Sequence, residues 1–164
     1  MGLPNKAVIG WDTMLVIVRD TREQKELSFD GLEGVDKVED MALPYGDYTA
    51  IIDDKPVPIV VERKSLGDCW KTMASDDYDR FKREFERCEK DNFHMILAIE
   101  GTYSDVLNGF DYSQFSGESM VKKLATLSVR YGIECWFMES RQMMAHRITQ
   151  TFLAVARNWK KEKK

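Results

Sequence analysis

Residues 46–68 read GDYTAIIDDKPVPIVVERKSLGD, and this stretch decides the fold. Two apolar, extended segments are separated by a DDKP break, which predicts two strands joined by a turn. Asp47 begins the first strand, Glu62 and Lys64 end the second, and Asp68 follows four residues later. A strand pair of this kind brings the start of one strand beside the end of the next. The sequence therefore predicts three carboxylates gathered beside a lysine.

The second strand, residues 57–64, has a period of two that sorts its side chains onto two faces. Glu62 and Lys64 are expected to point the same way, and Arg63 to the opposite face. An apolar strand that ends in three consecutive charged residues is costly unless those charges are paired or coordinate something. Glu-x-Lys alone is also common on a solvated hairpin, and the preceding Gly-Asp and the following Asp68 favour a site over that alternative.

The rest of the chain alternates strands and helices around this stretch. Strands are expected at 14–18, 38–43, 47–52, 57–64, 94–99 and 133–138, and helices at 65–73, 78–90, 116–131 and 140–159. Residues 24–39 are expected to be a loop with at most one irregular turn, and residues 38–64 a β-meander. The alternation that follows predicts an α/β fold with a mixed β-sheet and helices on both faces. We expect one domain over residues 1–164, with flexible ends at 1–12 and 160–164.

Composition restricts the class of protein. The chain is 43% hydrophobic and 32% charged, which is typical of a soluble globular protein. It has no apolar run of about 18 residues that would span a membrane, and its first residues do not resemble a secretory signal. We therefore expect an intracellular protein of the cytoplasm, nucleoid or nucleus that is not secreted.

The three cysteines do not indicate a metal site. Cys69, Cys88 and Cys135 are widely spaced, and the chain has only two histidines to join them. Reduced, buried thiols are the expectation.

The predicted carboxylate cluster is suited to phosphodiester hydrolysis. Hard carboxylate oxygens hold a divalent cation, which lowers the pKa of a bound water and neutralises charge on the phosphorus centre. Asp47 and Glu62 are the candidate metal ligands, with the backbone carbonyl of Arg63 as a third. Lys64 is expected to orient or help deprotonate the water, and Asp68 to reach the same pocket or a second metal.

These residues resemble a known family signature. Gly46-Asp47, Glu62-Arg63-Lys64 and Asp68 are similar to the GD…ERKxxxD motif of XPF-type structure-specific endonucleases, a branch of the PD-(D/E)XK nuclease superfamily. Asp20-Thr21-Arg22-Glu23, after a buried strand, resembles the DxRE element of these domains, and the resemblance runs from Val16 to Val155. It implies a restriction-endonuclease-like core and a Mg²⁺- or Mn²⁺-dependent DNA endonuclease acting on branched, flap or fork DNA.

The resemblance also implies roles for individual residues. The catalytic group would be Asp47, Glu62, Lys64, Asp20 and Asp68. The substrate-binding group would be Arg22, Glu23, Arg63 and Arg80. Two alternatives stay open: Arg63 as part of a structural ion pair, and Arg80 as one charge on a solvated helix face.

We expect the chain to lack the helix-hairpin-helix appendage that family members acting on flaps and forks commonly carry. A lone nuclease core therefore needs a partner protein, forms a homodimer through its last two helices, or acts less selectively. Its net charge of −4 counts against binding DNA by bulk attraction. Two rival functions follow: a catalytically silent DNA-binding or scaffolding module of the same fold, and a carboxylate-rich protein-interaction domain.

Overall fold

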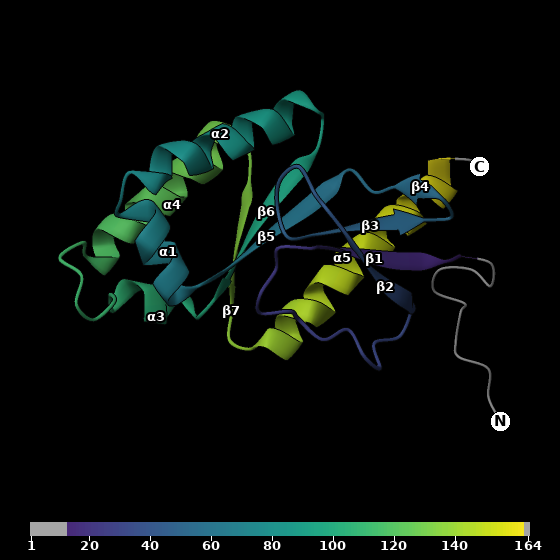
Figure 1. Ribbon diagram of the computed structural model, residues 1–164, viewed down its shortest axis with the longest axis horizontal. Helices are drawn as coiled ribbons and strands as arrows, with labels where there is room; N and C mark the ends of the chain where they lie inside the picture. The colour runs from purple at the N-terminus through teal and green to yellow at the C-terminus, as the bar shows by residue number, and fades with distance from the viewer. Residues whose placement is uncertain (1–12, 163–164) are drawn as a thin grey trace.

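A sheet of seven strands forms the middle layer of the computed structural model, which describes residues 13–162 (Figure 1). The strands are β1 (Leu15–Asp20), β2 (Val35–Met41), β3 (Tyr48–Ile52), β4 (Lys55–Pro56), β5 (Ile59–Ser65), β6 (His94–Glu100) and β7 (Glu134–Met138). Their order is β2-β1-β3-β5-β6-β7, with β4 paired to β3 beside this path. The pairs β1–β2, β5–β6 and β6–β7 are parallel, whereas β1–β3 and β3–β5 are antiparallel. The expected mixed sheet is confirmed.

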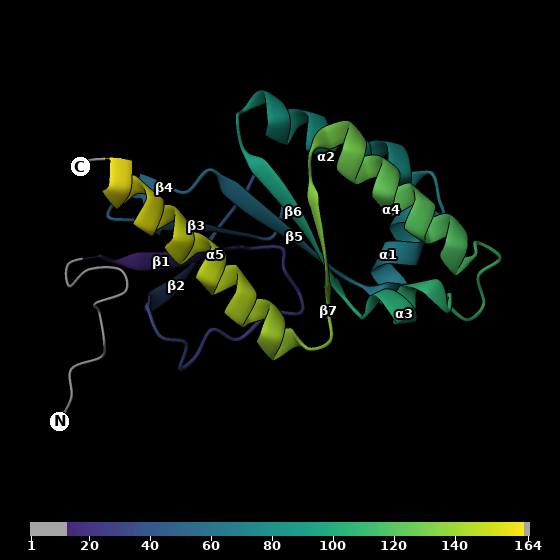
Figure 2. The same ribbon diagram turned by 180° about the vertical axis from the view of Figure 1, so that it is seen from behind.

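Helices cover both faces of this sheet. They are α1 (Leu66–Met73), α2 (Asp77–Lys90), α3 (Tyr103–Leu107), α4 (Gly117–Tyr131) and α5 (Arg141–Glu162). Alternate residues of β6 separate into two cores: Ile96 and Ala98 pack with α5, while Leu97 and Ile99 pack with α1, α2 and α4. Figure 2 shows α5 apart from the group of α1 to α4. The α/β fold class is therefore confirmed.

The expected β-meander over residues 38–64 is wrong at its first strand. β2 begins at Val35, inside the segment expected to be a loop, and runs parallel to β1, so that β1 separates β2 from β3. Only Val35 and Val38 of β2 pack against the core. A polar edge strand of this kind has little apolar alternation, and its position depends on pairing with β1. The antiparallel pairing of β3 with β5 is as expected.

Serine caps the start of two helices, and glycine ends one of them. The Ser65 hydroxyl accepts a bond from the backbone N–H of Asp68 at the start of α1, and Ser116 does the same for Ser119 at the start of α4. Gly132 ends α4 with φ +63°. Within residues 13–162 no helix is long and apolar enough to cross a membrane.

The carboxyl end of the chain differs from expectation. α5 continues to Glu162, into the range expected to be a flexible end. Lys160 Nζ donates to Thr13 Oγ1 at 2.7 Å, and Lys55 Nζ lies 4.1 Å from the Trp159 ring centroid, so the last turns pack on the sheet. The other expected flexible residues, 1–12 and 163–164, lie outside the described residues.

Candidate active site

The predicted site residues meet at one edge of the sheet. Because β1, β5 and β6 run in the same direction, their carboxyl ends share that edge, and the antiparallel β3 begins there. The backbone of Asp47 lies between β5 and the end of β1. Its N–H donates to the Val61 carbonyl at 2.8 Å, and its carbonyl accepts from the Asp20 N–H at 2.8 Å. This edge therefore collects Asp20, Asp47 and the charged end of β5.

Gly46 allows Asp47 to reach this place. Its φ is +72°, and a Cβ added there would lie 2.3 Å from Val60 Cγ2. No L side chain fits such a close approach in the left-handed region without displacement. Glycine is therefore required by both backbone conformation and packing, immediately before the candidate ligand.

The Asp47 side chain contacts the end of β5. Its Oδ2 accepts a bond from the Arg63 backbone N–H at 2.7 Å. Glu62 and Lys64 share one face of β5, with Lys64 Nζ 3.5 Å from Glu62 Oε1, as the period of two predicts. Lys64 Nζ also lies 4.7 Å from the ring centroid of Phe81 on α2, which covers this face. The lysine and the two acids are therefore neighbours in a partly buried place.

Electrostatics make this pair of acids unusual. Burial raises the pKa of Asp47, an effect that the Arg63 N–H bond opposes and the charge of Glu23 reinforces. Burial also raises the pKa of Glu62, and the nearby charge of Asp47 raises it further. Two carboxylates that resist ionising together, with one lysine beside them, lack positive charge. A divalent cation would supply it, so the chemistry of the donor set fits a metal.

The site offers a metal ion few protein ligands. Over residues 13–162 there is no group of three or more His, Cys, Asp or Glu side chains placed to hold a metal. The two side chains Asp47 and Glu62, with the Arg63 carbonyl, do not require such a group.

Asp20 and Arg22 form a link rather than part of an open acidic pocket. Asp20 is 3% exposed; it accepts from Arg22 Nε at 2.9 Å and from the Leu43 N–H at 2.9 Å. Arg22 Nη2 also donates to the Leu43 carbonyl at 2.7 Å. These bonds join the end of β1 to the segment that leads into Gly46. The Arg22 side chain is itself 70% exposed and accessible to an anion.

Arg63 lies on the opposite face, in a buried ion-pair network. Its guanidinium donates to Glu23 from Nε at 2.9 Å and from Nη2 at 2.7 Å, and to Glu100 from Nη1 at 2.8 Å. Arg141 at the start of α5 also bonds Glu100. The Arg63 side chain thus forms the structural ion pair that was one of its two alternatives, and its partner is Glu23. This geometry does not support substrate contact by either side chain.

Asp68 and Arg80 lie at the surface. Asp68 is exposed in the first turn of α1, and Arg80 pairs with Asp77 on α2 at 3.4 Å. Among the described residues, neither forms a hydrogen bond or ion pair with Asp47, Glu62 or Lys64. Their site roles stay predictions.

Glu84 on α2 is a site residue that sequence reasoning missed. It is half-buried, and its charge raises the pKa of Glu62 and of Arg22. The charge of a third carboxylate thus acts on Glu62, one of the two candidate ligands. The sequence did contain a signal for this position: Glu84 follows Phe81 by three residues on a predicted helix, so the two share a helix face, and Phe81 contacts Lys64.

A seven-stranded mixed sheet with these carboxylates and a lysine at one edge defines an XPF-type nuclease domain. The ERCC4 domain model matches residues 19–151, and the chain belongs to that family. The resemblance noted in the sequence is thereby confirmed. None of the curated proteins matches the chain in sequence.

Two solved structures share the fold. XPF from Aeropyrum pernix has a TM-score of 0.63 and 22% identity, over 88% of this chain and 65% of that one. XPF from Aeropyrum pernix in complex with DNA has a TM-score of 0.61 and 22% identity, over 90% of this chain and 66% of that one. The chain thus spans just under two thirds of each of these proteins.

Proposed function

We propose that this protein is a divalent-metal-dependent endonuclease that hydrolyses phosphodiester bonds of DNA. The observation that carries the proposal is the placement of Asp47 and Glu62, both with raised pKa values, beside Lys64 in a chain of the ERCC4 domain family. Asp47 and Glu62, with the Arg63 carbonyl, would hold Mg²⁺ or Mn²⁺. Their raised pKa values favour protonation in the metal-free protein, and a bound cation would displace those protons.

The chain's own residues prepare the reaction. A divalent cation, when bound, makes a water more acidic and screens the negative charge of the phosphate. Lys64 is placed to orient that water and to stabilise developing negative charge through its ammonium group. Phe81 and Glu62 contact the lysine and hold it in position. Asp68 would complete the catalytic group, and Asp20, predicted as a catalytic residue, would support it by holding the segment that leads into Gly46. Exposed Arg22 and Arg80 would contact flanking phosphates.

Branched, flap or fork DNA is the proposed substrate. The chain spans less than two thirds of the XPF chains that it matches, one of which is described as a complex with DNA. A second copy of the chain or a partner protein would supply the remaining selectivity. We propose that the protein acts on DNA inside the cell.

A catalytically silent DNA-binding module is the second candidate. It is favoured by the absence, within residues 13–162, of a cluster of three metal-binding side chains, and by the pairing of Asp20 and Glu23 with arginines. Such a module would bind the same DNA and leave it intact.

Cleavage assays separate the two candidates. Labelled fork and flap DNA would be incubated with the protein in Mg²⁺, in Mn²⁺ and in EDTA. We expect cutting only with metal, and we expect Asp47→Asn or Lys64→Ala to lower kcat by at least about 100-fold while binding is retained. Asp111→Asn and Lys161→Ala, both on exposed side chains, are matched controls. Cutting that persists in Asp47→Asn and Lys64→Ala would exclude this site.

A further inference from the structure

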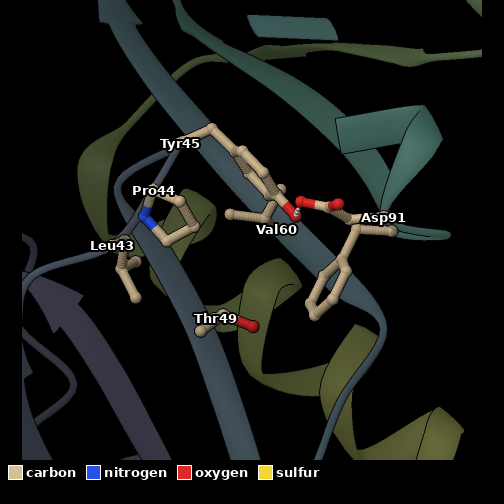
Figure 3. Close-up of a pocket in the computed structure, with 7 residues that line it drawn as sticks. Leu43, Pro44, Tyr45, Thr49, Val60 and Asp91 are labelled. Atoms are coloured by element: carbon tan, nitrogen blue, oxygen red, sulfur yellow. Dashed lines mark hydrogen bonds between the residues drawn. The ribbon is translucent and has the colours of Figure 1, made fainter. Parts of the chain in front are cut away.

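A pocket of about 310 Å³ opens next to the candidate active site (Figure 3). Its lining includes Pro44, Tyr45, Thr49, Val60, Asp91 and Phe93. It lies between the segment that leads into Gly46, the β3–β5 pair, and the loop from α2 to β6. None of these residues has a role in the proposed hydrolysis.

The pocket and the candidate metal ligands share one face of the sheet. Thr49 follows Asp47 by two residues along β3, and Val60 precedes Glu62 by two along β5. Side chains two apart on a strand lie on the same face, about 7 Å apart. Tyr48 and Val61 pair with each other across β3 and β5, at the positions between these residues. Their side chains point to the opposite face, into the core beneath α5. The pocket therefore begins one side-chain step from the carboxylates, a distance of about two nucleotide rises along a DNA strand.

The walls are apolar rings with acceptors near them. Tyr45 and Phe93 meet edge to face, with ring centroids 6.0 Å apart, and Pro44 is an exposed residue of the lining. The Tyr45 hydroxyl donates to Asp91 Oδ2 at 3.0 Å, and Thr49 Oγ1 donates to the Ile59 carbonyl at 2.7 Å. A carboxylate has acceptor sites beyond the one that Tyr45 uses.

These features select a class of ligand. The lining residues include no cation that would bind a phosphate, whereas aromatic and proline rings favour a flat ring. An exposed carboxylate at the edge accepts bonds from amino groups and repels carbonyl oxygens.

We propose that this pocket holds an unpaired nucleobase from a nucleotide within about two positions of the cleaved phosphate, and that it prefers bases with an exocyclic amino group. The proposal rests on the proposed function, since it takes the DNA to lie at Asp47 and Glu62. The base leaves the stack, lies among Tyr45, Phe93 and Pro44, and donates to Asp91. Selection for an unpaired base would by itself give the chain a preference for branched DNA.

The test scans the bases around the cut. Fork DNA would carry an abasic site, a thymine or an adenine at each of the unpaired positions beside the cleaved bond, and kcat/KM and DNA affinity would be measured for each. For one position we expect the abasic site to lower kcat/KM about tenfold, and thymine to be less favourable than adenine. Asp91→Asn should abolish the preference for adenine over thymine, because an amide can donate as well as accept.

A pair of variants at one position checks the location. Thr49→Phe fills the pocket and should make the protein indifferent to the abasic site, whereas Thr49→Val removes the hydroxyl without filling the space and should retain the abasic effect. Tyr112→Ala removes a fully exposed aromatic ring elsewhere and should also retain it. Thermal unfolding would verify that each variant is folded.

The outcomes are distinct. If the protein cuts but every position tolerates an abasic site equally, or if Thr49→Phe retains the abasic effect, the pocket assignment is overturned. If the protein cuts nothing, the proposed hydrolysis fails, and affinities measured in EDTA with the same DNA set decide the pocket separately: equal affinity for abasic and intact forks would overturn it.

Discussion

Gly46 shows how one residue positions the site. It combines a φ of +72° with a contact that leaves no room for a Cβ, and the next residue is Asp47. Gly31 has a similar φ of +74°, but no atom lies within 4 Å of the position where its Cβ would be. A side chain at position 31 would therefore meet backbone strain alone, whereas one at position 46 would meet both backbone strain and steric overlap.

We expect Gly46→Ala to destabilise the protein by about 2–4 kcal/mol, because left-handed strain adds to a clash with Val60. Gly31→Ala should cost only about 1 kcal/mol, from strain alone. Urea unfolding of both variants measures the difference. Equal losses in the two variants would show that the contact between position 46 and Val60 is relieved without cost.

Glu62 predicts a pH dependence of stability. Its pKa is raised to about 8 by burial and by the charge of Asp47, from about 4.3 in an unfolded chain. A carboxyl with a raised pKa binds its proton more tightly in the folded state, so its contribution to stability is fully present below about pH 4.3 and is lost as the pH rises through about 8.

Metal-free protein should therefore lose stability relative to Glu62→Gln between pH 5 and pH 8.5, since glutamine does not titrate. Thermal unfolding of both proteins in EDTA at several pH values measures this. A difference in Tm that stays constant over the range would contradict the raised pKa.

At the scale of elements, the ion-pair network of Glu23, Arg63, Glu100 and Arg141 connects four segments. It joins the loop after β1 to β5, β6 and the start of α5, and Arg141 Nη2 also donates to the carbonyls of Lys25 and Glu26 at 2.6 and 2.7 Å. Glu23 and Arg63 side chains are 4% and 5% exposed, so each depends on the other for compensation. The network holds the site edge of the sheet together from the face opposite Glu62.

Removing one partner of the Glu23–Arg63 ion pair should lower the free energy of unfolding more than replacing both partners. Arg63→Ala leaves Glu23 buried and unpaired, and we expect a loss of about 3–5 kcal/mol. The double variant Glu23→Leu with Arg63→Met should recover most of that loss, because apolar side chains of similar size replace the pair. Denaturant unfolding of the single and double variants gives the comparison.

The same double variant tests the role of Arg63. Its backbone N–H, which bonds Asp47, is unchanged. If Arg63 acts only by positioning, cleavage returns with stability. A stable double variant that binds DNA but does not cut would indicate that the guanidinium or Glu23 contacts the substrate.

At the scale of the whole molecule, charge limits how the proposed DNA substrate would bind. The net charge is −4, so attraction must come from local groups near the site, and Arg22 is exposed beside Asp20. The chain also matches under two thirds of the length of the XPF structures that share its fold. A surface with few phosphate contacts binds weakly and loses few counterions.

We expect weak binding of fork DNA at 150 mM salt, with a Kd on the order of micromolar or weaker. Arg22→Gln should reduce the slope of log Kd against log salt by about one, because one phosphate contact is lost. Lys161→Gln at the end of α5 is the charge-matched control and should leave the slope unchanged. Fluorescence anisotropy over a salt series measures both; equal slopes for wild type and Arg22→Gln would remove Arg22 from the interface.

The sequence by itself determined what depends on near neighbours. The period of two in residues 57–64 placed Glu62 and Lys64 on one face and Arg63 on the other. The expected helix starts at 65 and 116 agree with the serines that cap α1 and α4. Such features follow from the geometry of a strand or a helical turn. Only the tertiary structure decided the position of β2 beside β1, the pairing of Arg63 with Glu23 and Glu100, the approach of Glu84, and the pocket at Tyr45. Each joins residues far apart in the chain, and which distant partner a charged or apolar group meets is set by packing of the whole sheet and its helices rather than by local pattern.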